Sequence, residues 1–379
     1  MSSTKKKTKI LYEIRPSAIG GMERFLYNLI KHLDKKKFEP IVVSDRPSKL
    51  LSLFKSMGIE TKIFKLKYGV AVPIRLLNFL KISKIDIVQS NYHSATLALT
   101  AHAAHIPHVW HPGGHINVAH SQFTEQEKRC LLKTLYYFSV KIICFSKFVK
   151  EQFREFKKTK IKIIHCGIDI PQTNHHQSVI EVSKNGVQNN LRCFSIAMVA
   201  HFQPQKRHVD FIRAAEKVKK VLPNTKFFII GSAHKNQKSL NFAKSLHQMV
   251  KRMKMSQYIQ FTGFCKDISK FITNMDLIVL PSINEGLGIS VVEAMALKKP
   301  VIGADSGGLR EVIEDEKTGF LVPPKNPNRL AQAMIEILKN PIRAKQMGEA
   351  GKKRVQQLFD IVACARQYEC LYQMVHQNN

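Results

Sequence analysis

Residues 276–296 read Asp276-Leu-Ile-Val-Leu-Pro-Ser-Ile-Asn-Glu-Gly-Leu-Gly-Ile-Ser-Val-Val-Glu-Ala-Met-Ala296. Leu277–Leu280 form a short apolar run followed by a proline, which is typical of a strand buried in a parallel sheet. Gly286 and Gly288 then lead into a buried helix expected over Ile289–Leu297. The start of that helix would direct unpaired N–H groups and a partial positive charge past the strand end, where a phosphate fits.

Two glutamates, Glu285 and Glu293, stand eight positions apart, one before this helix and one about two turns inside it. At ~1.5 Å per residue their carboxylates would lie roughly 12 Å apart. Carboxylates accept strongly from paired hydroxyls, so one could hold sugar hydroxyls and the other ribose hydroxyls of a nucleotide-sugar. The alternative is that Glu293 is a polar position on a half-exposed helix and Glu285 a loop charge.

The chain has 379 residues, which exceeds the usual size of a single core and predicts two domains. The amino-terminal segment is lysine-rich and has no signal-peptide pattern, and no apolar run approaches the ~20 residues that span a bilayer. Seven dispersed cysteines without a Cys-x-x-Cys pair indicate reduced thiols. We therefore expect a cytoplasmic protein, with the inner face of the cell membrane as a further location.

The formal net charge is +32. Such a charge is compatible with nucleic acid, an anionic membrane surface or an acidic substrate, or with lysines that simply cover solvated faces. Positive charge and aromatic residues are densest between residues 128 and 162. That stretch could contact anionic lipid headgroups, although core packing explains most of its aromatic residues.

Strand-length apolar runs alternate with amphipathic helical patterns, which predicts two doubly wound, Rossmann-like α/β domains that face each other across a cleft. Strands are expected at Ile10–Ile14, Pro40–Ser44, Thr61–Phe64, Ile85–Gln89, Val109–His111, Lys141–Phe145, Ile161–His165, Cys193–Val199, Lys226–Gly231, Tyr258–Phe261, Leu277–Leu280 and Pro300–Gly303. Helices are expected at Glu23–Leu33, Pro73–Leu80, Glu125–Phe138, Arg207–Val221 and Asn241–Lys254.

The alternation lapses between the two halves, where polar residues show no helical or strand period. We expect a first domain over residues 1–170, a linker over 171–190 and a second domain over 191–359. Residues 327–377 look entirely helical, and helix 360–379 is expected to complete the first domain. In this architecture ligands bind beyond the carboxyl ends of the strands.

Several strand ends carry polar or glycine residues suited to a phosphorylated ligand. After the strand ending at Val199, Lys206 is expected to open a helix and bind a diphosphate. Glycines at Gly20-Gly21 would let a ligand approach the backbone, although an ordinary tight turn explains them equally well. The loop around Phe264 could contact a nucleobase.

His111 ends another strand of the first half, in the sequence Trp110-His-Pro-Gly-Gly-His115. A neutral imidazole at a strand end can donate to a hydroxyl or phosphate of the substrate. A structural histidine is the main alternative. A metal site at His111 and His115 lacks a third ligand at supporting spacing, so we expect no metal.

These residues resemble glycosyltransferase family 4, which has the GT-B fold, over nearly the whole chain. In the second half the resemblance rests on Lys206, Glu285, Glu293, the turn 305–311 and the segment 318–323. In the first half it rests on Gly20-Gly-Met-Glu-Arg24 and Ile164-His-Cys-Gly-Ile-Asp169.

The resemblance implies a retaining hexosyltransferase that needs neither metal nor cofactor and uses a nucleoside-diphosphate sugar. Lys206 would then neutralise the diphosphate, and Glu285 would sit against the transferred sugar. His111 would match the family's first-domain histidine, which lies near the same donor sugar. The residues expected to bind the donor are Gly20, Gly21, His201, Arg207, Phe264, Leu287, Gly288, Ile289 and Glu293. One departure is His201, which stands where the family commonly has an arginine; Arg207 could supply the missing charge.

The expected acceptor is a polysaccharide or lipid-linked glycan at the cell surface, with lipopolysaccharide among the candidates, and the first domain would bind it. Two alternatives remain. A nucleotide-sugar epimerase or hydrolase on the same fold would act on the donor without an acceptor. A basic nucleic-acid-binding protein would show steep salt dependence, but no nucleic-acid module is recognised in the sequence.

Overall fold

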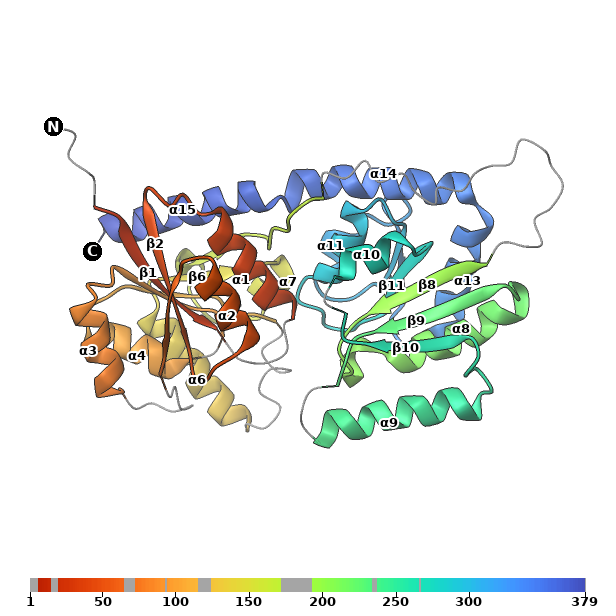
Figure 1. Ribbon diagram of the computed structural model, residues 1–379, viewed down its shortest axis with the longest axis horizontal. Coiled ribbons are helices and arrows are strands. Elements are labelled where there is room, and N and C mark those ends of the chain that lie inside the picture. Colours follow the sequence, from red (N-terminus) through yellow and green to blue (C-terminus); the bar gives the residue numbers. More distant parts are fainter. Residues whose placement is uncertain are drawn as a thin grey trace. The chain divides into compact units, whose positions relative to one another are not determined.

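The computed structural model describes residues 6–14, 20–64, 72–92, 94–114, 124–171, 193–233, 237–265 and 267–378. The chain divides into two compact units, one made of residues 1–169 and 360–379 and the other of residues 170–359 (Figure 1). We call them the first and the second unit. The segment expected as a linker, 171–190, lies almost wholly outside the described residues.

The first unit is built on a seven-stranded parallel sheet with strand order β3-β2-β1-β4-β5-β6-β7. Its elements are β1 (Thr8–Ile14), α1 (Gly21–His32), β2 (Phe38–Ser44), α2 (Lys49–Ser56), β3 (Glu60–Ile63), α3 (Ile74–Ile82), β4 (Ile87–Ser90), α4 (Ala95–Ala103), β5 (His108–Trp110), α6 (Glu125–Phe138), β6 (Lys141–Cys144), α7 (Lys147–Glu151), a 3-10 turn (Lys158–Lys160), β7 (Ile161–Ile163) and α15 (Ile361–Gln377).

The central strands of this sheet are covered on both faces. Ile10, Leu11 and Tyr12 are consecutive residues of β1 that point alternately to opposite faces, and all three are fully buried. A parallel sheet needs such cover, because each crossover helix must bury its apolar stripe against a sheet face. The strand order reverses between β1 and β4, which places a switch point at their carboxyl ends.

The last helix, α15, belongs to the first unit although it is the end of the chain. It packs beside α1, as Figure 1 shows. Gly167 lets the start of α15 lie close to the segment after β7, because an added Cβ there would lie 2.6 Å from the Ile361 Cα atom and 2.8 Å from the Cys364 Cβ atom. Asp360 caps α15 by accepting from the Ala363 N–H at 2.8 Å.

The second unit contains a six-stranded parallel sheet with order β10-β9-β8-β11-β12-β13, so its switch point lies between β8 and β11. Its elements are β8 (Phe194–Val199), a 3-10 turn (Pro204–Lys206), α8 (His208–Val221), β9 (Thr225–Ile230), α9 (Gln237–Arg252), β10 (Ile259–Gly263), α10 (Ile268–Thr273), β11 (Leu277–Leu280), α11 (Ile289–Ala296), β12 (Val301–Ala304), α12 (Leu309–Val312), β13 (Phe320–Val322), α13 (Pro327–Lys339) and α14 (Pro341–Leu358).

The doubly wound α/β architecture predicted from the alternation of strands and helices is confirmed. Each strand expected from an apolar run is present within a few residues of its predicted bounds, whereas β13 was not predicted. The structure corrects two helix starts. Lys206 ends a 3-10 turn and α8 begins two residues later, at His208, and α9 begins at Gln237 rather than at Asn241. None of the described helices is long and apolar enough to cross a membrane.

Candidate functional site

The carboxyl ends of β8 and β11 bring Lys206 and Glu285 together at the switch point of the second unit. The Lys206 Nζ atom lies 2.5 Å from the Glu285 Oε2 atom, and both side chains are largely shielded, with 20% and 17% of their surfaces exposed. Lys206 comes from the 3-10 turn after β8, and Glu285 from the loop after β11. A shielded cation beside a carboxylate at a switch point is suited to bind a phosphorylated, hydroxyl-bearing ligand.

Backbone hydrogen bonds join three loops around this ion pair. The Ile283 N–H donates to the Gln205 carbonyl oxygen at 2.9 Å, which connects the loops after β11 and β8. The Gly308 N–H donates to the Glu285 carbonyl oxygen at 2.7 Å, which connects the loops after β12 and β11. The Asn284 N–H also donates to the Ser306 hydroxyl at 3.1 Å. The ion pair is therefore held by fixed backbone, which preorganises it.

Helix α11 begins beside Glu285. Gly288 precedes it with a φ of +90°, a conformation that glycine adopts easily, and an added Cβ would lie 2.5 Å from the Leu309 Cδ2 atom. Leu287 is buried, Ile289 opens the helix and Glu293 is half-buried in its second turn. The Val291 N–H donates to the Gly288 carbonyl oxygen at 2.8 Å, which leaves the N–H groups of Ile289 and Ser290 at the helix start, a position that suits an anion.

The other predicted residues of the second unit differ in their surroundings. The His201 Nδ1 atom lies 3.2 Å from the Ser232 carbonyl oxygen, and Phe264, which follows β10, is 53% exposed. The Arg207 guanidinium donates to both carboxylate oxygens of Asp210, at 2.8 and 2.9 Å. Like Lys206, Arg207 is thus paired with a carboxylate, and its part in binding a diphosphate stays a prediction.

In the first unit, Gly20 and Gly21 lie at the start of α1, where Glu23 organises the switch point. One Glu23 carboxylate oxygen accepts from the Gly20 N–H at 3.1 Å, and the other accepts from the Tyr92 hydroxyl, which follows β4. Glu23 is only 7% exposed. The glycine turn is thus tied to the end of β4 through a buried carboxylate.

His111 follows β5 and is fully buried. Its ring stacks on Phe145 with centroids 5.5 Å apart, and Phe25 lies 5.9 Å away on another side. Neither ring nitrogen has a hydrogen-bond partner among the described residues. Burial lowers the pKa of His111 to about 3, so the imidazole is neutral at physiological pH. One nitrogen of a neutral ring can donate and the other can accept.

Two family models match the chain. The model described as Glycosyltransferase Family 4 matches residues 19–172, and that described as Glycosyl transferases group 1 matches residues 180–354. The chain belongs to glycosyltransferase family 4. The resemblance inferred from Lys206, Glu285 and Glu293 is thereby confirmed, and the protein is a group 1 glycosyltransferase.

Curated relatives agree with this assignment. The uncharacterized glycosyltransferase MJ1178 of Methanocaldococcus jannaschii is 27% identical over 361 residues, which are 88% of this chain and 89% of that protein. A trehalose synthase of Pyrococcus horikoshii is 32% identical over 176 residues, which are 46% of this chain and 42% of that protein.

Solved structures of similar fold include HepE of Anabaena in complex with UDP, with a TM-score of 0.80 and 20% identity over 97% of this chain and 100% of that one. Sucrose-phosphate synthase of Thermosynechococcus elongatus has a TM-score of 0.76 and 19% identity over 98% of this chain and 100% of that one. At such identities the likeness establishes the GT-B fold of this glycosyltransferase and nothing finer.

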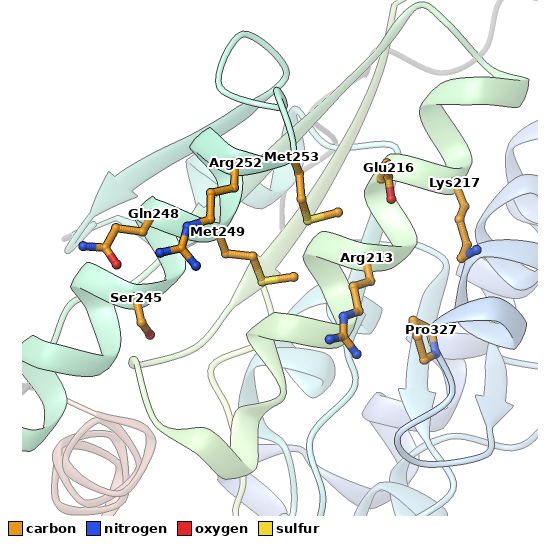
Figure 2. A pocket seen from close by; sticks show the side chains of 9 residues that line it. All are labelled: Arg213, Glu216, Lys217, Ser245, Gln248, Met249, Arg252, Met253 and Pro327. Atoms are coloured by element: carbon orange, nitrogen blue, oxygen red, sulfur yellow. The ribbon is translucent and has the colours of Figure 1, made fainter.

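A groove of about 540 Å³ lies elsewhere in the second unit, between α8 and α9 (Figure 2). Arg213 and Arg252 line it together with Met249 and Met253, and its lining includes none of the predicted site residues. In open α/β sheets ligands bind beyond the carboxyl ends of the strands, at the switch point. The Lys206–Glu285 edge, and not this groove, is therefore the candidate site.

Residues at the end of β4 were missed by the sequence analysis. Gln89 and Asn91 are fully buried polar residues at the switch point of the first unit, and Tyr92 binds Glu23. The signal was present in the run Gln89-Ser-Asn-Tyr92, which places polar residues at the end of a buried strand. No group of three metal-binding side chains occurs within the described part of the chain; His115 lies outside it.

The burial of His111 predicts a pH-dependent stability. Its pKa is about 3 in the folded chain against 6.5 ordinarily, so between these values the unfolded chain binds a proton that the folded chain does not. The unfolding free energy should therefore be constant above this window and fall as pH drops through it. Between pH 7 and pH 5, the unfolding free energy measured with urea should fall by about 2 kcal/mol less in His111→Phe than in the parent.

His108 and His208 share this lowered pKa of about 3 through burial, so they should keep part of the pH dependence in the His111→Phe variant. The exposed His376, replaced by phenylalanine, serves as the control for loss of a histidine that is not buried. Equal pH dependence in His111→Phe and the parent would contradict a buried, neutral His111.

Proposed function

We propose that this glycosyltransferase moves a hexosyl group from a nucleoside-diphosphate sugar to an acceptor hydroxyl, with retention of the anomeric configuration and without a metal ion. The observation that supports this proposal most is the Lys206–Glu285 pair at the switch point of the second unit. A lysine ammonium can neutralise a diphosphate, and the adjacent start of α11 adds N–H groups that favour an anion.

In this proposal the ion pair opens when the donor binds. A diphosphate carries more negative charge than one carboxylate and would compete for the Lys206 ammonium. Glu285 would then be released from its 2.5 Å contact with Lys206 and could accept hydrogen bonds from hydroxyls of the transferred sugar. Glu293 would hold the ribose, and the exposed ring of Phe264 would contact the nucleobase. Gly20, Gly21 and His111 would contribute from the first unit.

The proposed step breaks the bond between the anomeric carbon and the departing phosphate oxygen and forms a bond from that carbon to the acceptor oxygen. The acceptor proton passes to the departing phosphate oxygen, so no separate base is required. Charge on the leaving diphosphate increases during this step, and Lys206 would stabilise it. The loops fixed around Glu285 would hold the sugar in position for attack.

Nucleotide-sugars are the proposed donor class, and this choice is supported by the UDP and UDP-glucose present in the HepE structures of similar fold. For the acceptor, we propose a cell-surface polysaccharide or lipid-linked glycan at the cytoplasmic face of the membrane. The net charge of +32 fits peripheral contact with anionic lipid. In the first unit's basic stretch, Tyr136 and Phe153 are buried while Tyr137 is 70% exposed.

A thermal-shift screen against uridine, guanosine and adenosine diphosphate sugars tests this proposal. A bound donor at 100 times its dissociation constant should stabilise the protein by about 2.7 kcal/mol, with or without EDTA. Lys206→Met should lose that stabilisation, whereas Lys345→Met, on the exposed surface of α14, should keep it. No shift with any donor would refute the proposal, and rapid acceptor-independent epimerisation or hydrolysis of the donor would favour the alternative reaction.

A further inference from the structure

A buried chain of hydrogen bonds runs from the carboxy-terminal helix to the switch point of the first unit. The Tyr12 hydroxyl donates to the Tyr372 hydroxyl at 3.0 Å, and the Tyr372 hydroxyl donates to the Gln89 Oε1 atom at 2.7 Å. The Gln89 amide donates to the Asn91 Oδ1 atom at 2.8 Å, and the Asn91 amide donates to the Glu13 carbonyl oxygen at 2.9 Å. We call this series the Tyr372 relay.

The relay has a fixed direction. The Glu13 carbonyl oxygen can only accept, so Asn91 presents its NH₂ group to Glu13 and its Oδ1 atom to Gln89. Gln89 then presents its Oε1 atom to Tyr372, so the Tyr372 hydroxyl donates to Gln89 and accepts from Tyr12. That donation holds the Gln89 carbonyl oxygen toward Tyr372 and its NH₂ group toward Asn91. Tyr12, Tyr372, Gln89 and Asn91 are all fully buried, so water does not replace a missing partner.

The relay ends where the first unit's candidate residues meet. Asn91 precedes Tyr92, whose hydroxyl donates to Glu23 and whose carbonyl oxygen accepts from the Trp110 Nε1 atom at 2.9 Å. Trp110 in turn precedes His111. A displacement of the Asn91 amide would therefore also displace residues at the start of α1 and at the end of β5.

We propose that Tyr372 is a positioning residue, through which α15 sets the geometry of the Asn91–Tyr92 segment and hence of the acceptor-side site. This inference rests on the proposed function, because it assumes that the first unit's switch point takes part in the reaction. It assigns to the last helix of the chain an effect on activity that is separate from its role in covering the sheet.

The neighbouring Tyr368 provides an internal comparison. Tyr368 lies one turn before Tyr372 on α15 and is equally buried, but its hydroxyl has no hydrogen-bond partner among the described residues. Its ring packs on Phe25 at 5.9 Å, a contact that phenylalanine keeps. Burial raises the pKa of Tyr372 and of Tyr368 well above the ordinary value, so both hydroxyls stay protonated over the working pH range.

The test compares Tyr372→Phe with Tyr368→Phe, since each removes one buried hydroxyl from the same helix. Trp110 is the only tryptophan of the chain, is fully buried and bonds to Tyr92, so its fluorescence reports on the segment directly. Tyr372→Phe should raise acrylamide quenching of Trp110 by roughly twofold or more, through local opening, and Tyr368→Phe should leave it unchanged.

Kinetics give the second measurement. Tyr372→Phe should lower kcat/KM for the acceptor by about tenfold, because small misplacements near the reacting groups are costly. Tyr368→Phe should stay within about twofold of the parent. In a Gln89→Leu background the relay is already broken, so Tyr372→Phe should cause no further loss.

Equal Trp110 quenching in the two tyrosine variants would overturn the inference, whatever the activity. So would equal losses of kcat/KM, or an undiminished effect of Tyr372→Phe in the Gln89→Leu background. If Trp110 quenching increases in Tyr372→Phe alone but the parent protein transfers no sugar, the relay is supported and the proposed function is refuted.

Discussion

Replacing Lys206 with methionine is expected to lower kcat by on the order of 10²- to 10³-fold, the range seen when a preorganised group that stabilises developing charge is removed. Methionine keeps much of the length and apolar volume of the lysine stem but removes the ammonium that lies 2.5 Å from Glu285. Steady-state kinetics with a saturating acceptor would measure the loss. The matched control is Lys345→Met, which removes an exposed positive charge from the same unit and should stay near the parent rate.

A loss in Lys206→Met has two explanations, which a second variant separates. Lys206 could act on the departing diphosphate, or it could serve only to neutralise the partly buried Glu285 carboxylate. If neutralisation of Glu285 were its only role, then Lys206→Met would cause no further loss of activity in a Glu285→Gln background, because no unpaired charge remains. We expect a further loss, since the leaving phosphate still lacks its cation.

Urea unfolding of the same variants provides the check on stability. Removing one partner of a shielded ion pair destabilises the protein, and that effect must be distinguished from a loss of catalysis at the assay temperature. A folded Lys206→Met protein with an unchanged kcat would remove Lys206 from the mechanism and leave the proposed charge stabilisation without its main residue.

The strands were predictable because their residues are buried on both faces of a parallel sheet. Leu277–Leu280 form β11 with the predicted bounds, and all four residues have less than 3% of their surface exposed. By contrast, β13 consists of only three residues, Phe320–Val322, flanked by a glycine and a proline. Its pairing with β12 identifies this run as a strand.

The site was only partly predictable, because its local geometry depends on contacts between distant segments. Lys206 and Glu285 lie close together because they follow β8 and β11, which are neighbours in the sheet. The residue motifs and the expected switch point together could therefore indicate this pair. The left-handed conformation of Arg207, with φ of +60°, is what separates the 3-10 turn from α8. The local sequence did not reveal that conformation, although the bond from Arg207 to Asp210 joins residues only three positions apart.

The environment of His111 also lies beyond local sequence patterns. Its aromatic neighbours come from α1 and from the loop after β6, so Phe25 precedes it by 86 positions and Phe145 follows it by 34. The sequence predicted a histidine at a strand end but not its complete burial. Burial then decides its protonation state, which is why the chemistry of this residue required the structure.

Replacing Gly308 with alanine is expected to lower kcat/KM for the donor by on the order of 10²-fold, because a displacement of about 1 Å near reacting groups can cost that much. An added Cβ would lie 2.1 Å from the Gly286 carbonyl oxygen and 2.9 Å from the Leu287 Cα atom. Both are backbone atoms, so no side chain can rotate away. The loops after β12 and β11 must separate, and the bond from the Gly308 N–H to the Glu285 carbonyl oxygen would break.

The control is Gly319→Ala, which creates a similar clash away from the site. Its Cβ would lie 2.3 Å from the Val301 carbonyl oxygen, at the amino-terminal ends of β12 and β13. Both variants should lose about 1–3 kcal/mol of stability through overpacking. Only Gly308→Ala should lose donor binding in the thermal-shift assay, because parallel strands place the site at their carboxyl ends. Equal losses of donor binding in the two variants would show that the clash acts through stability alone, and the loops around Glu285 would then have no special role in holding the donor.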